Sequence, residues 1–388
     1  MKQWAKDEQM IQQVQGYAEG YYGRLPSWEE RSQLLDTLAS NQQNTYYYAP
    51  KEDPCHRLQW RTPYSTQWRD NFARFCEKAR QSAIQVVAGI APGLDFDFNH
   101  LQGGADIQAL KAKAIGLLED GASGVSLLLD DIDENFAEHS AGIASEGEAH
   151  ALLANLLGEA LEQSLWITPR VYANELARQS PHYLPDFLRT LNSSHTVIYC
   201  GSDVVARIAA TVDIQSVSHM YGHAMILWDN LYANDYCPRR LYLGEWSGRS
   251  SPQGVLLNPT GMINTDRLLL DLMACGSQNE SASGLCLHDD WWGVLQSHGV
   301  PACFKHIARY FYHPVFNDQT YLSPALADAT TMEAIEHCLW RWKTPLSREW
   351  YPYIFGLKHD LLLATQSLPD IRIQKTQNPP LVERLLGE

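Results

Sequence analysis

The sequence lacks the features of a secreted, membrane-bound or nucleic-acid-binding protein. Its eight cysteines form no C-x-x-C pair, which fits free thiols in a reducing compartment and gives no indication of a zinc site. No apolar run is long enough to cross a bilayer, and the start, MKQWAKDEQM, has no signal-peptide core. A net charge of −15 argues against nucleic acid or an anionic membrane as partner. These absences predict a cytoplasmic protein.

The sequence is rich in the residues that build a large core. Hydrophobic residues make up 45% of the chain, which is too many for extended disorder. Short apolar runs rich in β-branched and aromatic residues predict eight strands. The strands are expected at residues 15–19, 45–49, 85–90, 124–129, 165–168, 196–200, 224–228 and 254–257. Nearly continuous apolar strands indicate burial on both faces, as in a parallel sheet.

Helical patterns fall between most of the strands and after the last one. They span residues 27–39, 67–82, 107–118, 148–163, 185–191, 203–210 and 264–274. The first begins with a capping box, Ser27-x-x-Glu30. The alternation predicts an α/β fold of the (β/α)₈ TIM-barrel type. A doubly wound open sheet is the alternative, but GYAEGYYGR lacks the G-x-G-x-x-G spacing typical of it.

The strand rhythm stops near residue 290, which predicts two domains. Residues 1–289 are expected to form the barrel, and residues 290–388 a smaller helical domain with helices at 304–312, 331–342 and 350–366. The final TQNPPLVERLLGE is marked by prolines and is expected to be loose. The sequence leaves open whether the chain forms a homodimer through this C-terminal domain.

Polar residues stand at the C-terminal ends of seven of the predicted strands, and in a barrel these ends meet at one mouth. The fourth strand ends in LLLDDIDEN, where Asp130 and Asp131 follow three leucines directly. Two carboxylates this close cannot both ionise cheaply in a partly dry site, so one pKa rises and the pair can act as a general acid. A solvated turn, a helix N-cap and a Mg²⁺ site are the alternatives. Asp133 is expected to support the pair or to cap a helix.

The adjacency of the two aspartates restricts the chemistry. Retaining glycosidases ordinarily place two carboxylates across the scissile bond, which sequence neighbours on one strand end cannot easily do. A substrate with a 2-acetamido group supplies its own nucleophile, the acetamido oxygen. One aspartate would then hold the acetamido N–H, and the other would protonate the leaving oxygen. Substrate-assisted enzymes are the known exception to the two-carboxylate layout.

Six segments strengthen this interpretation: EGYYGR, YYYAPKED, APGLDF, LLLDDID, WDNLYANDY and GVLLNP occur in this order between Gly16 and Pro259. Together they resemble glycoside hydrolase family 84, the β-N-acetylglucosaminidases that include protein O-GlcNAcase. The resemblance implies a retaining exo-β-N-acetylglucosaminidase that works through an oxazoline intermediate and needs no cofactor or metal. Its partners would be GlcNAc-bearing glycosides, glycans or glycoproteins.

The resemblance also implies roles for individual residues. Asp130 would orient the acetamido nitrogen, and Asp131 would be the general acid and then the base. The substrate-binding residues would contact the sugar hydroxyls, the acetamido group or the pocket wall. They are Gly20, Asp235 and Asn258 for the hydroxyls, Tyr172 for the acetamido oxygen, Lys51 for the acetamido or hydroxyl region, Asn230 for the acetamido group or the aglycone oxygen, and Trp228 for the wall.

The sequence departs from the family pattern in two places. It reads GRLPSW where GRPW is expected, and TPRVY after the fifth strand where a pattern like CPTEY is expected. The second departure bears on the assignment of Tyr172 and on the acetamido pocket. Two other interpretations stay open: a GlcNAc-binding barrel with weak or no turnover, and a metal-dependent barrel hydrolase.

Overall fold

The computed structural model of the chain describes residues 13–132, 143, 145–206, 211–237, 239–277, 289–312 and 328–364. Asp133 and the proline-marked C-terminal stretch lie outside these ranges. The chain forms two compact units, Met1–Tyr236 with Trp246–Cys286, and Cys237–Glu245 with Leu287–Glu388. Packing units need not coincide with domains, so the domain division at residues 289 and 290 stays a prediction.

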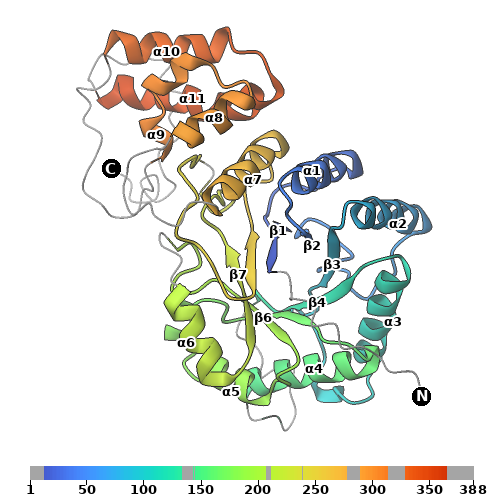
Figure 1. Cartoon of the computed structure of the whole chain (residues 1–388). Coiled ribbons are helices and arrows are strands. Elements are labelled where there is room, and N and C mark those ends of the chain that lie inside the picture. Colours follow the sequence, from blue (N-terminus) through green and yellow to red (C-terminus); the bar gives the residue numbers. More distant parts are fainter. Residues whose placement is uncertain are drawn as a thin grey trace, which may run out of the picture. The chain divides into compact units, whose positions relative to one another are not determined.

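Eight parallel strands close into a barrel in sequence order, with β8 paired to β1. Figure 1 shows labelled strands of the barrel with helices outside them. All eight predicted strands are present. They are β1 (Val14–Glu19), β2 (Thr45–Tyr48), β3 (Gln85–Ile90), β4 (Gly124–Leu128), β5 (Trp166–Thr168), β6 (Thr196–Tyr199), β7 (Ala224–Asp229) and β8 (Gly254–Leu257). The fold is therefore the predicted (β/α)₈ barrel, and the open doubly wound sheet is excluded.

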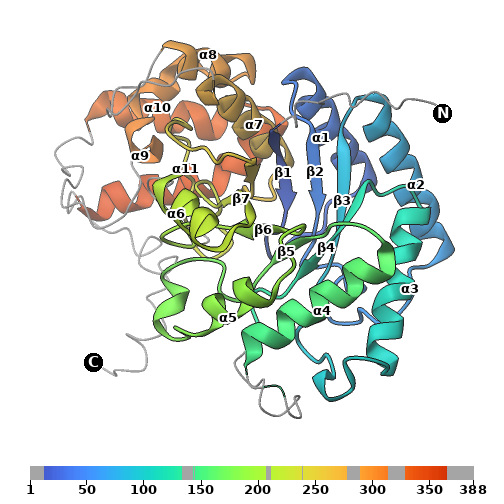
Figure 2. The same cartoon turned by 60° about the horizontal axis from the view of Figure 1, so that its bottom comes forward.

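Helices follow most of the strands and surround the barrel, as the second view makes clear (Figure 2). They are α1 (Trp28–Ser40), α2 (Thr66–Gln81), α3 (Ala105–Glu119), α4 (Glu146–Leu161), α5 (Tyr183–Thr190), α6 (Thr211–Tyr221) and α7 (Ile263–Ser277). The capping box that begins α1 is formed as predicted: Ser27 accepts from the Glu30 amide, and Glu30 accepts from the Ser27 amide. It fixes the entry into α1 directly after the first mouth loop.

The helix predicted at residues 203–210 does not begin where expected, because residues 203–206 form a bend and a turn. Residues 207–210 lie outside the described ranges, and the helix before β7 is α6. The turn is held by side chains from neighbouring loops: the Val204 amide donates to Glu175 Oε1 at 2.5 Å, and the Val204 carbonyl accepts from Asn230 Nδ2 at 2.8 Å. These bonds replace the backbone bonds of a helix, which the local pattern could not reveal.

The second unit is helical, as expected. Its helices are α8 (Asp289–Ser297), the 3₁₀ helix η4 (Ala302–His306), α9 (Arg309–Tyr312), α10 (Ala329–Trp340) and α11 (Pro345–Ala364). The sequence analysis missed α8 and predicted η4 and α9 as one helix. Across the described residues, no helix is long and apolar enough to cross a membrane.

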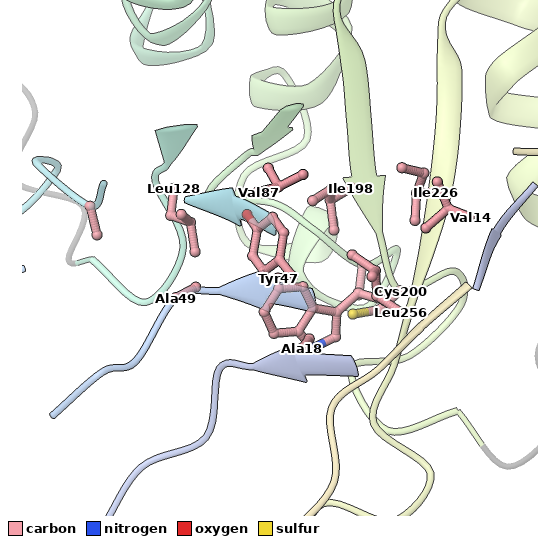
Figure 3. Close-up of a cluster of buried hydrophobic side chains, with 13 residues drawn as sticks. Val14, Ala18, Tyr47, Ala49, Val87, Leu128, Ile198, Cys200, Ile226 and Leu256 are labelled. Atoms are coloured by element: carbon pink, nitrogen blue, oxygen red, sulfur yellow. The ribbon is translucent and has the colours of Figure 1, made fainter. Parts of the chain in front are cut away.

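Small and large apolar side chains fill the barrel interior (Figure 3). Tyr47 and Trp228 are the largest of them, and their rings meet edge to face with centroids 5.5 Å apart. The Tyr47 hydroxyl is paired with Ser126 Oγ at 2.5 Å, so its polar end is satisfied inside the core. A packed interior of this kind is a rigid floor, and function is left to the strand ends above it.

A buried ion pair ties the first strand to its helix on the outside of the barrel. Glu19 is fully buried, and its carboxylate accepts two hydrogen bonds from Arg31 of α1, at 2.8 and 2.6 Å. The Tyr46 hydroxyl of β2 donates to the same carboxylate at 2.5 Å. Because Glu19 directly precedes Gly20, this cluster fixes where the first strand enters the mouth.

Candidate active site

Five of the nine predicted site residues continue the inward-facing positions of the strands. Side chains alternate along extended backbone, so the second residue after an inward-facing one faces inward again. The inward core residues Ala18, Ala49, Leu128, Trp228 and Leu256 are each followed two positions later by Gly20, Lys51, Asp130, Asn230 and Asn258, all of them buried. These five residues therefore form the layer directly above the hydrophobic floor.

Asp130 and Lys51 form a buried ion pair in this layer. Lys51 Nζ contacts Asp130 Oδ2, and the side chains of Lys51 and Asp130 are only 2% and 8% exposed, respectively. Burial would lower the pKa of Lys51, but the carboxylates of Asp130 and Asp131 raise it above its ordinary value. Lys51 is thus a buried ammonium and not a solvated loop lysine. Among the described residues, the other carboxylate oxygen of Asp130, Oδ1, is buried and has no hydrogen-bond partner, which leaves an acceptor available to a ligand.

Asp131 is held by two tyrosine hydroxyls. Tyr172 donates to its Oδ1 at 3.0 Å, and Tyr22 donates to its Oδ2 at 2.9 Å. Lys51 Nζ lies 3.6 Å from Oδ2. The backbone of Asp131 has φ of 54°, in the left-handed region that residues other than glycine, asparagine and aspartate rarely adopt. Asp131 consequently does not follow the alternation of side chains along the strand. It lies beside Asp130, and hydrogen bonds orient both of its carboxylate oxygens.

The two aspartates differ in acidity because their surroundings differ. Burial and the neighbouring Asp131 charge raise the pKa of Asp130, and the attraction of Lys51 does not offset them. Burial would also raise the pKa of Asp131, but Lys51, the two tyrosine hydroxyls and Arg57 outweigh it and lower that pKa. Asp130 is therefore the weaker acid of the two, the reverse of the order that the predicted roles require.

Amide side chains form the opposite part of the layer. The Gly20 amide donates to Asn258 Oδ1 at 3.1 Å, and Asn258 Nδ2 donates to Asn230 Oδ1 at 2.9 Å. Trp228 Nε1 donates to the same Asn230 oxygen at 2.8 Å. These bonds fix the orientation of both asparagine amides and of the indole, so β1, β7 and β8 present one connected polar wall.

Asp235 joins this wall to the aspartate pair. Its Oδ2 accepts from the Tyr22 amide at 3.0 Å, and Tyr22 in turn reaches Asp131. The structure thus brings all nine predicted residues together. Hydrogen bonds connect the residues around the two aspartates, and other hydrogen bonds connect the amide wall. The short segment from Gly20 to Tyr22 joins these two groups. Their roles toward a substrate stay predictions.

The site also contains residues that the sequence analysis did not select. Tyr22 and Arg57 contact Asp131, and both lie within or next to segments already singled out, EGYYGR and YYYAPKED. Thr168 Oγ1 at the end of β5 is buried and faces the Tyr47 hydroxyl. Within the described part of the chain, no three His, Cys, Asp or Glu side chains are arranged to hold a metal ion.

Replacing Gly20 with alanine tests the amide wall. A Cβ at this position would lie 2.3 Å from Trp228 Cζ2 and 3.3 Å from Asn258 Oδ1. Because the indole is locked against Tyr47, we expect the variant to lose about 1–3 kcal/mol of unfolding free energy and to bind sugar more weakly. Urea unfolding and KM measure the two effects.

Gly116 in α3 is the matched control, since a Cβ there meets nothing within 4 Å. Gly116→Ala should keep wild-type activity and gain about 0.5–1 kcal/mol of stability. Wild-type stability and KM in Gly20→Ala would mean that the indole does not stand where the structure places it.

The closed barrel carries the adjacent carboxylates of Asp130 and Asp131 just after β4, where the sequence segments predicted them. The model of the β-N-acetylglucosaminidase family matches residues 15–280, which is well over half of the chain. The chain belongs to this family, as the six sequence segments indicated.

Two curated relatives, the protein O-GlcNAcases of Rattus norvegicus and Mus musculus, are each 33% identical to the chain over 258 residues. That match covers 63% of the chain but spans only 28% of the length of either relative.

Solved structures agree on the fold. A mutant of the Thermobaculum terrenum O-GlcNAc hydrolase superposes with a TM-score of 0.74 at 20% identity, covering 89% of this chain and 81% of that one. CpGH84B superposes with a TM-score of 0.66 at 23% identity, covering 93% of this chain and 64% of that one.

Proposed function

We propose that the chain hydrolyses terminal β-linked N-acetylglucosaminides with retention of configuration, using the acetamido group of the substrate as nucleophile. The observation that carries the proposal is the free, buried Oδ1 of Asp130, fixed by Lys51 and placed next to Asp131 on the same strand end. A lone acceptor in a buried position matches one N–H of the substrate. Membership of the β-N-acetylglucosaminidase family supports the same reaction.

In the first step, Asp130 Oδ1 accepts the acetamido N–H and turns the acetamido oxygen toward the anomeric carbon. That oxygen attacks, the bond from the anomeric carbon to the aglycone oxygen breaks, and Asp131 gives its proton to the departing oxygen. The product in the site is an oxazoline-like ring whose positive charge lies close to the Asp130 carboxylate. A buried anion next to developing positive charge stabilises the transition state more than the ground state.

In the second step, Asp131 takes a proton from water, and the water oxygen adds to the anomeric carbon and opens the ring. Two displacements on one carbon give overall retention. The cycle needs Asp131 protonated at its start. Substrate binding changes the pKa values of the two aspartates. The hydrogen bond from the acetamido N–H to Asp130 favours the ionised form of Asp130, and the charge of Asp130 then raises the pKa of Asp131. Lys51 holds Asp130 in place through both steps.

The amide wall suits the hydroxyl side of the sugar. Asn258 and Asp235 offer oriented polar atoms, and Trp228 offers an apolar face next to them. We propose GlcNAc-bearing glycosides as the substrate class. Two relatives are protein O-GlcNAcases, and GlcNAc on a protein hydroxyl is accordingly one candidate linkage for this chain.

The test is turnover of an aryl β-N-acetylglucosaminide, with the product anomer followed by NMR and EDTA as a parallel control. We expect hydrolysis that EDTA does not change, with the β-anomer formed first. The α-anomer first would contradict retention. Binding of GlcNAc without turnover would favour the binding-protein alternative, and loss of activity with EDTA would favour the metal-dependent hydrolase.

A second series tests the nucleophile. Successive fluorine atoms on the acetamido methyl group withdraw electrons from the attacking oxygen without changing the leaving group. If the acetamido oxygen attacks, kcat/KM should fall steeply with each fluorine. A flat series would mean that an enzyme carboxylate is the nucleophile.

A further inference from the structure

Arg57 contacts the catalytic pair from outside the set of residues assigned so far. It lies six positions after Lys51, in the connection from β2 to α2, and its guanidinium is half-buried. Its Nη1 donates to the Tyr22 hydroxyl oxygen at 2.5 Å. Its Nη2 donates to the main-chain carbonyl oxygen of Asp131, also at 2.5 Å. One planar side chain thus reaches both the backbone of Asp131 and the tyrosine that holds the carboxylate of Asp131.

The first contact fixes the direction of a hydroxyl group. A guanidinium can only donate hydrogen bonds, so the Tyr22 oxygen must accept from Arg57 and keep its own proton for another partner. That partner is Asp131 Oδ2, at 2.9 Å. Without Arg57 the hydroxyl would be free to rotate toward water, and the carboxylate would lose a directed donor.

The second contact bears on the backbone. Asp131 has φ of 54°, a conformation that persists in a side-chain-bearing residue only when its surroundings hold it. The bond from Arg57 to the Asp131 carbonyl is one such restraint. The loop that carries Tyr22 is anchored independently, because the Tyr22 amide donates to Asp235 and the Gly23 amide donates to Glu52 Oε1 at 2.8 Å. Loss of Arg57 should therefore release Asp131 without releasing the Tyr22 loop.

We propose that Arg57 is a positioning residue for Asp131, acting on the carboxylate through Tyr22 and on the backbone directly. The role rests on the proposed function of Asp131 as general acid. Arg57 itself has no place in the proposed chemistry, since it directs its donors at Tyr22 and at a main-chain carbonyl.

The position of Arg57 has a consequence for the pH dependence of activity. Among the described residues, the charged and titratable groups that face Asp131 are Asp130, Lys51, Arg57, Tyr22, Tyr172 and Cys200. Arg57 and the Tyr22 hydroxyl both favour the ionised form of Asp131. Removing either one raises its pKa. A general acid works only when protonated, so activity falls as pH rises through that pKa. The alkaline limb should therefore move to higher pH in Arg57→Ala and Tyr22→Phe.

The experiment compares Arg57→Ala, Arg57→Lys and Tyr22→Phe with wild type on an alkyl and a nitrophenyl β-N-acetylglucosaminide. We expect Arg57→Ala to lose about 10- to 100-fold in kcat on the alkyl glycoside, less than the full contribution of a general acid. The loss should be smaller on the nitrophenyl glycoside, whose leaving group needs little protonation. Arg57→Lys keeps the charge but lacks the planar fork. It should restore the alkaline limb more fully than it restores kcat.

Arg61→Ala is the matched control. Arg61 lies in the same connection, but its guanidinium pairs with Asp95 and Asp106, away from the catalytic pair. It should keep the wild-type leaving-group dependence and pH profile. Equal losses of Arg57→Ala on both glycosides, with an unmoved alkaline limb, would reduce Arg57 to a structural residue and overturn the proposal.

A measurement without turnover separates this proposal from the proposed function. Aspartate labelled with ¹³C at the side-chain carboxyl, with the Asp131 signal assigned by its absence in Asp131→Asn, reports the titration of Asp131 directly. The signal should titrate at higher pH in Arg57→Ala than in wild type or Arg61→Ala. An unchanged titration overturns the role of Arg57. A shifted titration in a chain that cleaves no glycoside would leave Arg57 as the partner of Asp131 and overturn the proposed reaction instead.

Discussion

Asp131→Asn should lower kcat/KM on an unactivated β-N-acetylglucosaminide by about 10²- to 10⁴-fold, the usual contribution of a general acid or base. Asparagine has the shape of aspartate but cannot deliver the proton to the aglycone oxygen or take one from water. The fold should persist, because asparagine tolerates the left-handed backbone found at this position and can still accept from one of the two tyrosines.

The leaving group discriminates between the two halves of the reaction. With a nitrophenyl leaving group the first step needs little protonation, so the loss of kcat/KM should shrink strongly. The second step still lacks its base, and kcat should stay low while the oxazoline accumulates. A thermal melt close to that of wild type serves as the folding control. Loss of the same size on both leaving groups would remove Asp131 from proton transfer.

Asp130→Asn should lower kcat by about 10²- to 10³-fold, the range found when one oriented electrostatic partner of a transition state is removed. The variant loses the negative charge that faces the developing oxazoline, and it can present its amide nitrogen where Oδ1 accepted. It also leaves Lys51 with Asp131 as the remaining carboxylate nearby, 3.6 Å away. We expect this rearrangement to reduce stability as well.

Two comparisons make the Asp130 prediction specific. Its loss should be nearly the same for good and poor leaving groups, because Asp130 donates no proton to the aglycone. The fluorine series on the acetamido group should change slope in this variant, since Asp130 acts on that group alone. If Asp130→Asn instead shows the leaving-group dependence expected for Asp131→Asn, the roles of the two aspartates are exchanged.

The barrel could be predicted from sequence because its signal is local. Each strand is buried on both faces, so runs such as GVSLLL and AMILW are nearly continuous and stand out from the helical periodicity around them. The start of the helix placed at residues 203–210 could not be predicted correctly, because the structure there depends on contacts distant in sequence. Val204 is held by Glu175 and Asn230 from other loops, and the local sequence pattern contains no signal of those bonds.

The site residues also differ in how far the sequence could predict them. Asp130, Lys51 and Asn258 could be selected because they follow strands directly. Tyr22 and Arg57 could not, because their contacts with Asp131 cross 109 and 74 positions of sequence. The sequence also predicted that one aspartate pKa rises without saying which one. The difference is set by the donors that converge on Asp131, and these come from three separate loops.

The two-residue step from the core to the site limits where the sequence can accept insertions. Gly20, Lys51, Asp130, Asn230 and Asn258 each follow an inward-facing residue by two positions, so inserting one residue within a strand would turn the residue at the site out of the barrel. An insertion further along the loop leaves this order intact. The extra residues of GRLPSW lie after Arg24, and the Gly20 amide keeps its bond to Asn258. The rim loops can therefore change in length and sequence while the residues beneath them stay in register.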